Sequence, residues 1–249
     1  MCCPSPYWQT ESVTGSLYTK RAGDPSNPTL ILLHGGGAAS RMWKKQLSGL
    51  SERYHVIAPD QPGFGRSPGP LSLEACADAV ADLVDECGPV HLCGMSMGAL
   101  IAARVAVERP GSVRRLILQG ASIRPAERGR RAIRFFRSRP GWWYMKAVSD
   151  LADRPTLLAM VDALVEADMT GLLPLIASPT LIVCGARDKE CLPDAQPLAD
   201  AIPHALLVVV PHTGHWMPVT AAKAFNAIVD GFLTGPSRAT GSTGSVDVP

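Results

Sequence analysis

Short apolar runs rich in β-branched residues alternate with helical stretches along most of this chain, and this alternation restricts its fold more than any other feature. A run that is apolar throughout fits a strand buried on both faces, and a helical stretch fits the crossover between two parallel strands. The pattern therefore predicts an α/β protein with a mostly parallel central sheet flanked by helices. The strand-like runs are Thr29 to Leu33, His55 to Pro59, Val90 to Cys93, Val113 to Gln119, Thr180 to Cys184 and Leu206 to Val210.

Helical periodicity fills most intervals between these runs, and several helical stretches end at Pro or Gly. The opening segment, Tyr7 to Lys20, alternates in polarity and contains the turn residue Gly15, so it predicts an antiparallel hairpin at the edge of the sheet. The predicted helices are Ser40 to Arg53, Leu73 to Cys87, Met97 to Arg109, Pro193 to Ala201 and Ala221 to Leu233.

One interval interrupts the alternation. About sixty residues without a strand-like run separate Gln119 from Thr180, where strands of such folds are usually joined by loops of roughly 2 to 6 residues. We therefore expect a helical cap, residues 121–178, inserted after the sixth strand of a single α/β core formed by residues 1–120 and 179–234. The cap would lie over the C-terminal edge of the sheet, where open α/β folds bind ligands. The Gly-, Ser- and Thr-rich tail, residues 235–249, is expected to be disordered.

Composition narrows the classes of function. A chain of 249 residues that is 46% apolar can bury one substantial core. A formal net charge of +2 is too small to make nucleic acid the main partner. No window is apolar enough for a membrane span and the first 30 residues lack a secretory signal, so we expect a cytoplasmic protein that acts on a small molecule. Seven scattered cysteines without CxxC spacing indicate reduced thiols, not a disulfide framework or a zinc site.

The strongest local motif is Gly94-Met95-Ser96-Met97-Gly98, which follows a strand-like run and opens an Ala-rich helix. A sharp strand-to-helix turn strains the serine backbone and exposes its hydroxyl, while the flanking glycines let strand and helix backbones approach closely. The helix N-terminus also favours negative charge that develops on an attacked carbonyl. This context indicates a nucleophilic serine and not an ordinary helix N-cap.

A serine hydroxyl is a weak nucleophile, so it needs a base, and the base needs an orienting acid. Asp188 follows the run Thr180 to Cys184, and His215 lies in the loop after Leu206 to Val210. Loops at the carboxyl ends of neighbouring strands can converge on the crevice that holds Ser96. Here the chain resembles the α/β-hydrolase superfamily over nearly its whole length, in the order serine, acid, histidine. The resemblance implies that Ser96, Asp188 and His215 form a catalytic triad.

Two more stretches fit this resemblance. His34-Gly35-Gly36-Gly37 follows the first strong strand, as the family's oxyanion loop does, which implies the backbone N–H of Gly36 as one oxyanion donor. The second donor would be the N–H of Met97, the residue after the nucleophile. The family's histidine at the position of His34 braces the oxyanion loop. Residues 60–67, which read DQPGFGRS, look like the family's loop after the fourth strand.

The assignments of base and acid each have a competitor. His212 and His215 are three residues apart in one loop, but only His215 matches the family's Gly-His pattern before the last helix. His212 is interpreted as a solvated or structural neighbour. The loop that begins at Gly120 offers no carboxylate, which favours Asp188 as the acid over a surface salt-bridge role for it.

The predicted cap combines arginines with aromatic residues. Its tryptophans, Trp142 and Trp143, are candidate substrate-binding residues that would wall an apolar pocket. The arginines would then attract an anionic substrate, acyl-coenzyme A or an acidic carrier protein. The simpler alternative is a helix with a solvated basic face and a core-facing aromatic stripe. The cluster contains Arg124, Arg128, Arg130, Arg131, Arg134, Arg137, Arg139, Phe135, Phe136 and Tyr144.

The leading hypothesis is a serine hydrolase that cleaves an ester, thioester or lactone through an acyl-enzyme, without a metal or an organic cofactor. Hydrolysis of a carbon–carbon bond in a diketone is an alternative, because similar folds with a stretch like Gly214-His215-Trp216 catalyse it. However, the family's characteristic arginine has no clear match here. Decarboxylation and cofactor-free oxidation also stay open, since a fold does not fix a function. A catalytically silent ligand-binding module is the hypothesis from another class.

Overall fold

The computed structural model describes residues 9–14, 17–125, 130–149 and 153–235, and its centre is an eight-stranded sheet in the order β1-β2-β4-β3-β5-β6-β7-β8. Strands β3 to β8 run parallel, whereas β2 pairs antiparallel with both β1 and β4. The strands are β1 (Gln9–Thr14), β2 (Leu17–Ala22), β3 (Thr29–Leu33), β4 (His55–Pro59), β5 (Val90–Met95), β6 (Val113–Gln119), β7 (Thr180–Gly185) and β8 (Leu206–Val210).

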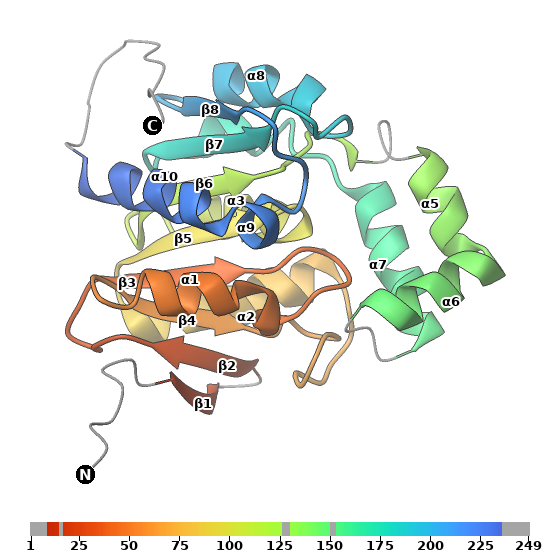
Figure 1. The fold of residues 1–249 in the computed structure, drawn as a ribbon, viewed down its shortest axis with the longest axis horizontal. Helices are drawn as coiled ribbons and strands as arrows, with labels where there is room; N and C mark the ends of the chain where they lie inside the picture. The colour runs from red at the N-terminus through yellow and green to blue at the C-terminus, as the bar shows by residue number, and fades with distance from the viewer. Residues whose placement is uncertain (1–8, 15–16, 126–129, 150–152, 236–249) are drawn as a thin grey trace.

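Helices cover both faces of this sheet, as the sequence predicted (Figure 1). One face carries α2 (Leu73–Cys87), α3 (Met97–Glu108) and α8 (Leu192–Ala201). The other carries the 3₁₀ helix η1 (Ser40–Trp43) with α1 (Lys44–Gly49), α9 (Met217–Thr220) and α10 (Ala222–Thr234). The expected helix at Ser40 to Arg53 is thus a 3₁₀ turn followed by a short α-helix that stops at Gly49.

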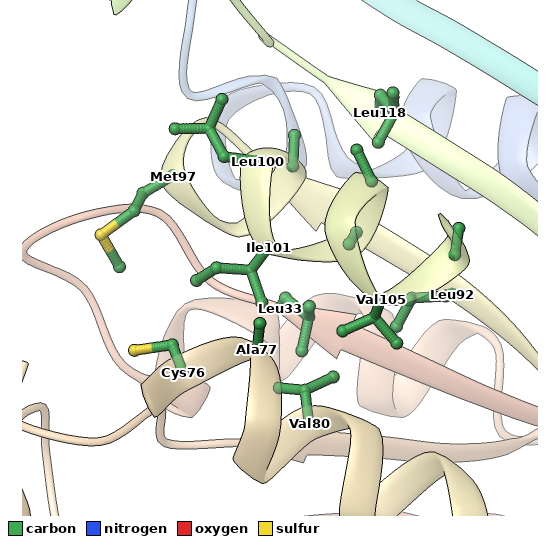
Figure 2. Close-up of a cluster of buried hydrophobic side chains, with 14 of the residues drawn as sticks. Leu33, Cys76, Ala77, Val80, Leu92, Met97, Leu100, Ile101, Val105 and Leu118 are labelled. Carbon is green, nitrogen blue, oxygen red and sulfur yellow. The ribbon is translucent and has the colours of Figure 1, made fainter. Parts of the chain in front are cut away.

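Alternate residues of each strand face the two helical layers. In β3, Ile31 and Leu33 belong to the apolar cluster beneath α2 and α3, whereas Leu30 and Leu32 belong to the cluster beneath α1 and α10. Figure 2 shows the first cluster, in which residues of α3 such as Ile101 lie against α2. Both clusters are buried from solvent, so the central strands are fixed from both sides and their ends are held rigidly.

The interval between β6 and β7 is helical. It contains α5 (Arg130–Arg137), α6 (Arg139–Val148), α7 (Arg154–Glu166) and the 3₁₀ helix η2 (Leu173–Leu175). Ser138 and Asp153 cap the N-termini of α6 and α7 with their side chains, and each helix has Pro in its first turn. Helices α5, α6 and α7 pack on one another beyond the carboxyl ends of the parallel strands (Figure 1).

The inserted helices share a buried core with the sheet. Leu157, Met160 and Val161 of α7 lie in the same apolar cluster as α2 and α3. No helix in the described part of the chain is long and apolar enough to cross a membrane. Of the expected disordered tail, Gly235 follows α10 and residues 236–249 lie outside the described residues.

Candidate active site

Ser96 occupies a strained turn between β5 and α3. Its backbone has φ 53° and ψ −117°, a region that L-residues other than glycine rarely adopt. A Cβ on Gly94 would lie 2.1 Å from the carbonyl oxygen of Gly98, and one on Gly98 would lie 2.5 Å from that of Leu33. Both flanking glycines are therefore needed for the close approach of strand and helix, as the motif predicted.

Half-buried His215 and buried Asp188 form a hydrogen-bonded pair. The imidazole Nδ1 lies 2.7 Å from Asp188 Oδ2, and the backbone N–H of Cys191 donates to Oδ1 at 3.2 Å. Burial by itself would raise the pKa of the Asp188 carboxyl, but the hydrogen bond and charge of His215, with the Cys191 N–H, hold that pKa below its usual value. Asp188 is thus ionised and holds the His215 ring through Nδ1, which leaves Nε2 as the ring nitrogen outside this hydrogen bond.

Backbone contacts between two loops set the position of this pair. The N–H of Arg187 donates to the carbonyl of Thr213 at 2.8 Å, and the N–H of Ala186 donates to that of Val210 at 3.0 Å. We call residues 186–191, which carry Asp188, the acid loop, and residues 211–216, which carry His215, the histidine loop. Gly185 lies so close to the histidine loop that a Cβ on Gly185 would be 2.5 Å from the carbonyl oxygen of Thr213. The acid loop and the histidine loop are therefore held as one unit at the carboxyl ends of β7 and β8.

His34 braces the glycine loop after β3. It is fully buried, its Nε2 accepts the backbone N–H of Gln61 at 3.0 Å, and its Nδ1 lies 2.9 Å from the carbonyl of Gly35. Because Nε2 accepts, the proton resides on Nδ1 and is donated to Gly35. The amide Nε2 of Gln61 also donates to the His34 carbonyl at 2.8 Å. Both ring nitrogens of His34 thus make structural hydrogen bonds, so His34 is not a candidate general base.

Two methionines from the inserted helices cover the same glycine loop. A Cβ on Gly36 would lie 2.8 Å from Sδ of Met160 on α7, and one on Gly37 would lie 2.7 Å from Cε of Met145 on α6. The backbone of the loop is therefore in van der Waals contact with the cap. Gly37 has φ 80°, so a glycine is required there for conformation as well.

One cavity of about 460 Å³ brings the sequence-predicted residues together. Ser96, Met97, Gly36, Asp188 and His215 all line it. Its apolar wall comes mainly from α3 and the cap, while the exposed residues Arg187, Lys189, Glu190 and Trp216 also line it. The apolar wall consists of Leu100, Ile133, Phe136, Met145, Met160, Val161 and Leu164.

The two tryptophans predicted to bind substrate do not line this cavity. Trp143 is 65% exposed, and Trp142 is half-buried against the apolar cluster. The ammonium of Lys146 lies 5.9 Å and 5.6 Å from their ring centroids, as expected for cation–π contacts at the outside of α6. The aromatic residues that line the cavity are instead Phe136, Tyr144 and Trp216. The sequence of this short helix did not show that Tyr144 lines the cavity and that its neighbour Trp143 does not.

The structure also separates the two histidines of the last loop. His212 is exposed, has φ 60°, and its Nδ1 lies 3.4 Å from the guanidinium of Arg187, so it is the solvated neighbour that was predicted. Sequence reasoning missed Gly120 and Cys191 as neighbours of His215. A Cβ on Gly120 would lie 3.1 Å from its Nδ1, and Cys191 Sγ lies 3.8 Å from that atom. Neither residue stands in a motif with His215, so no local signal marked them.

Asp188, Cys191 and His215 also form a group whose potential metal-ligating atoms lie within 4.8 Å of one another. Burial strongly raises the pKa of the Cys191 thiol, which donates to the carbonyl of Gly120 at 3.1 Å. A protonated thiol is a poor ligand, and the carboxylate and Nδ1 already bind each other. The hydrogen bonds account for this cluster of side chains.

The comparisons with known proteins agree with this fold. The chain belongs to the alpha/beta hydrolase family, which residues 30–228 match. A protein from Variovorax paradoxus described as a putative carbamate hydrolase is 30% identical over 87% of this chain and 96% of its own. A pimeloyl-[acyl-carrier protein] methyl ester esterase from Methylococcus capsulatus is 29% identical over 65% of this chain and 77% of its own. A solved esterase from Thermogutta terrifontis is 25% identical and superimposes with a TM-score of 0.74 over 91% and 98% of the two chains.

Proposed function

We propose that this hydrolase cleaves a carboxylic ester, thioester or lactone of a small molecule through an acyl-enzyme on Ser96. One observation carries the proposal most directly. The His215–Asp188 pair, with Nδ1 and Oδ2 2.7 Å apart, lines the same cavity as a serine held in a strained turn at a helix N-terminus. Activated serines require this combination of nucleophile, oriented base and buried acid.

The chemistry divides into two balanced steps. Nε2 of His215 takes the hydroxyl proton as Ser96 Oγ attacks the carbonyl carbon, and the proton then passes to the departing alcohol or thiol. Asp188 stabilises the imidazolium while the N–H groups of Gly36 and Met97 hold the oxyanion. In the second step His215 takes a proton from water, the hydroxide attacks the acyl carbon, and Ser96 leaves with that proton.

The cavity supports a substrate with an apolar acyl group. Its inner wall consists of aliphatic, methionine and phenylalanine side chains, whereas the charged residues lie on the exposed acid loop. A volume of about 460 Å³ fits a small ligand and not a polymer segment. The acyl part therefore enters toward the cap and α3, and the leaving group faces the loop that carries Arg187 and Lys189.

A fluorophosphonate probe tests the nucleophile directly. We expect the parent protein to be labelled on Ser96, and Ser96→Ala to lose both labelling and turnover, the latter by a factor on the order of 10⁴ or more. Ser48→Ala, which changes an exposed serine of α1, should label like the parent. Equal labelling of the parent and Ser96→Ala would remove the proposed nucleophile and favour a silent binding module.

Carbamate hydrolysis is the second candidate, because the Variovorax paradoxus relative described as a putative carbamate hydrolase aligns over nearly the whole chain. The same residues would attack a carbamoyl carbon, and the product would include ammonia or an amine. Ammonia release from a simple carbamate, measured beside release of p-nitrophenol from its acyl esters, separates the two activities. Turnover of the carbamate alone would replace the ester assignment.

A further inference from the structure

A second cavity, of about 370 Å³, adjoins the catalytic one along α3. It is bounded by the start of α2, by α3, and by the end of α7 with the chain that follows it. None of the proposed catalytic residues lines it. Its apolar lining consists of Leu71, Leu73, Ile101, Met169 and Leu172, with Ala163 of α7 and Ala167 just after that helix, and the charged residues Glu74, Arg104, Glu166 and Asp168 line it as well.

Leu100 lines both cavities. It is one turn along α3 from Ser96, and residues four apart lie on the same face of a helix, about 6 Å along its axis. The next residue on that face, Arg104, lines only the second cavity. A path from the catalytic serine along α3 therefore meets Leu100 first and the second cavity beyond it. Leu100 projects from the second turn of α3 in Figure 2.

Helix α7 makes the opposite wall of this path. Met160, Val161 and Leu164 line the catalytic cavity, whereas Ala163 lines the second, so α7, like α3, borders both cavities. At the far end, Arg104 is held by Glu108 at 2.7 Å and Glu74 at 3.7 Å. Leu100 is only 6% exposed and lines both cavities, so its side chain lies at their boundary.

We propose that Leu100 is the partition that ends the acyl-binding pocket and so determines the longest acyl group that the enzyme accepts. The inference rests on the proposed acyl-enzyme at Ser96. Short acyl chains fit in front of the Leu100 side chain, whereas longer ones must displace it or bend toward solvent. Truncation of Leu100 joins the two cavities and lets the distal methylenes of a long chain contact the apolar side chains of the second cavity, such as Ile101 and Met169.

The test is the acyl-length profile of p-nitrophenyl esters from acetate to dodecanoate. Each methylene that gains a buried place is worth about fourfold in affinity. We therefore expect Leu100→Ala to raise the ratio of kcat/KM for decanoate over butyrate by about tenfold or more. Leu83→Ala is the matched control, because Leu83 of α2 is buried in the same apolar cluster but lines neither cavity. It should leave the ratio as in the parent.

Two further substitutions of Leu100 test the partition even if Leu100→Ala does not fold. Leu100→Val should shift the profile in the same direction by less, and Leu100→Phe should shift it toward shorter chains. A folded Leu100→Ala or Leu100→Val enzyme with the parental profile overturns the partition.

If the enzyme turns over no ester, the proposed function is contradicted, but the role of Leu100 as a partition can still be tested separately. The partition is then decided by calorimetric binding of decanoate and butyrate to Ser96→Ala with and without Leu100→Ala. Preferential binding of decanoate after truncation supports the partition, and an unchanged preference overturns it.

Discussion

Gly185 is the residue at which the loop that carries Asp188 touches the loop that carries His215. It ends β7, and the carbonyl oxygens of Thr213 and Gly214 would lie 2.5 Å and 2.8 Å from a Cβ placed there. Because these neighbours are backbone atoms of the histidine loop, they cannot give way as a flexible side chain would. The loop as a whole would have to move, and His215 would move with it.

We therefore predict that Gly185→Ala lowers kcat by about 10- to 100-fold, since displacement of a catalytic group by about 1 Å has effects of this size. The downfield proton resonance of the His215–Asp188 hydrogen bond should shift or broaden in the same variant. Gly214→Ala is the matched control, because a Cβ at that position meets no atom within 4 Å. Parental kcat and an unaltered resonance in Gly185→Ala would contradict the argument.

Individual residues could be predicted from the sequence where their immediate neighbours in the chain identify them. Ser96 stands in a self-contained motif, and His215 is distinguished from His212 by its neighbour Gly214. Cys191 was interpreted only as a reduced thiol, yet it lies against His215 and donates its backbone N–H to Asp188. That contact depends on how two loops fold onto each other, which no pattern within either loop encodes.

The elements of the core were more predictable than those of the cap. Strands β3, β4, β6 and β8 begin and end at the residues that the apolar runs indicated. In β3 and β4 the reason is burial on both faces, which leaves an unbroken apolar signal. In the cap, α5 and α6 are short, and each has one exposed side and one side toward another helix. Apolar periodicity over so few turns did not show which aromatic residues face the cavity.

Helices α5 and α6 carry the charge of the cap. Residues 130–149 contain several arginines and Lys146 but no acidic residue. Arg137 is paired with Asp162 of α7, whereas Arg134 and Arg139 are exposed. Both helices also contribute side chains to the catalytic cavity. A positive field at this place would attract the phosphates of acyl-coenzyme A or an acidic carrier protein that brings an acyl group.

If the positive charge of α5 and α6 attracts anionic substrates, reversing charges on these helices will lower the turnover of charged substrates only. We predict that Arg134→Glu with Arg139→Glu lowers kcat/KM for an acyl-coenzyme A by about tenfold at low salt and leaves neutral p-nitrophenyl esters nearly unaffected. The difference should vanish near 0.5 M salt, where the Debye length is only about 4 Å. Reversal of two exposed lysines of α1, Lys44 and Lys45, is the control. Equal losses for charged and neutral substrates would refute electrostatic recruitment.

The stability of the whole molecule depends on a histidine far from the catalytic cavity. His91 of β5 is buried beneath Tyr54, and burial, with the charges of Arg115 and Arg114, lowers its pKa from the usual 6.5 to about 4. Its Nδ1 has no hydrogen-bond partner among the described residues. The folded protein therefore keeps His91 neutral where the unfolded chain already binds a proton.

The sign follows from the depressed pKa of His91. Above pH 6.5 neither state is protonated and stability is complete, and as the pH falls from 6.5 toward 4 the unfolded state binds more protons and stability is lost. We expect this loss to be about 2 kcal/mol in the free energy of unfolding after partial solvent screening. Denaturant unfolding of His91→Gln across this pH range should show a flatter dependence, whereas exposed His204→Gln should match the parent. If the free energy of unfolding of His91→Gln and of the parent depended on pH in the same way, His91 would not be the cause of the loss of stability.

The shared core of cap and sheet limits how the enzyme can admit its substrate. Leu157 and Val161 are completely buried, and Met160 is nearly so, in the apolar cluster that also holds α3. A hinged flap that swung clear would wet all three side chains at once, at a cost of several kcal/mol. We therefore expect substrate to enter where exposed residues such as Arg187 and Trp216 line the cavity, so the fixed width of the cavity there, and not a hinged motion of the cap, decides which molecules reach Ser96.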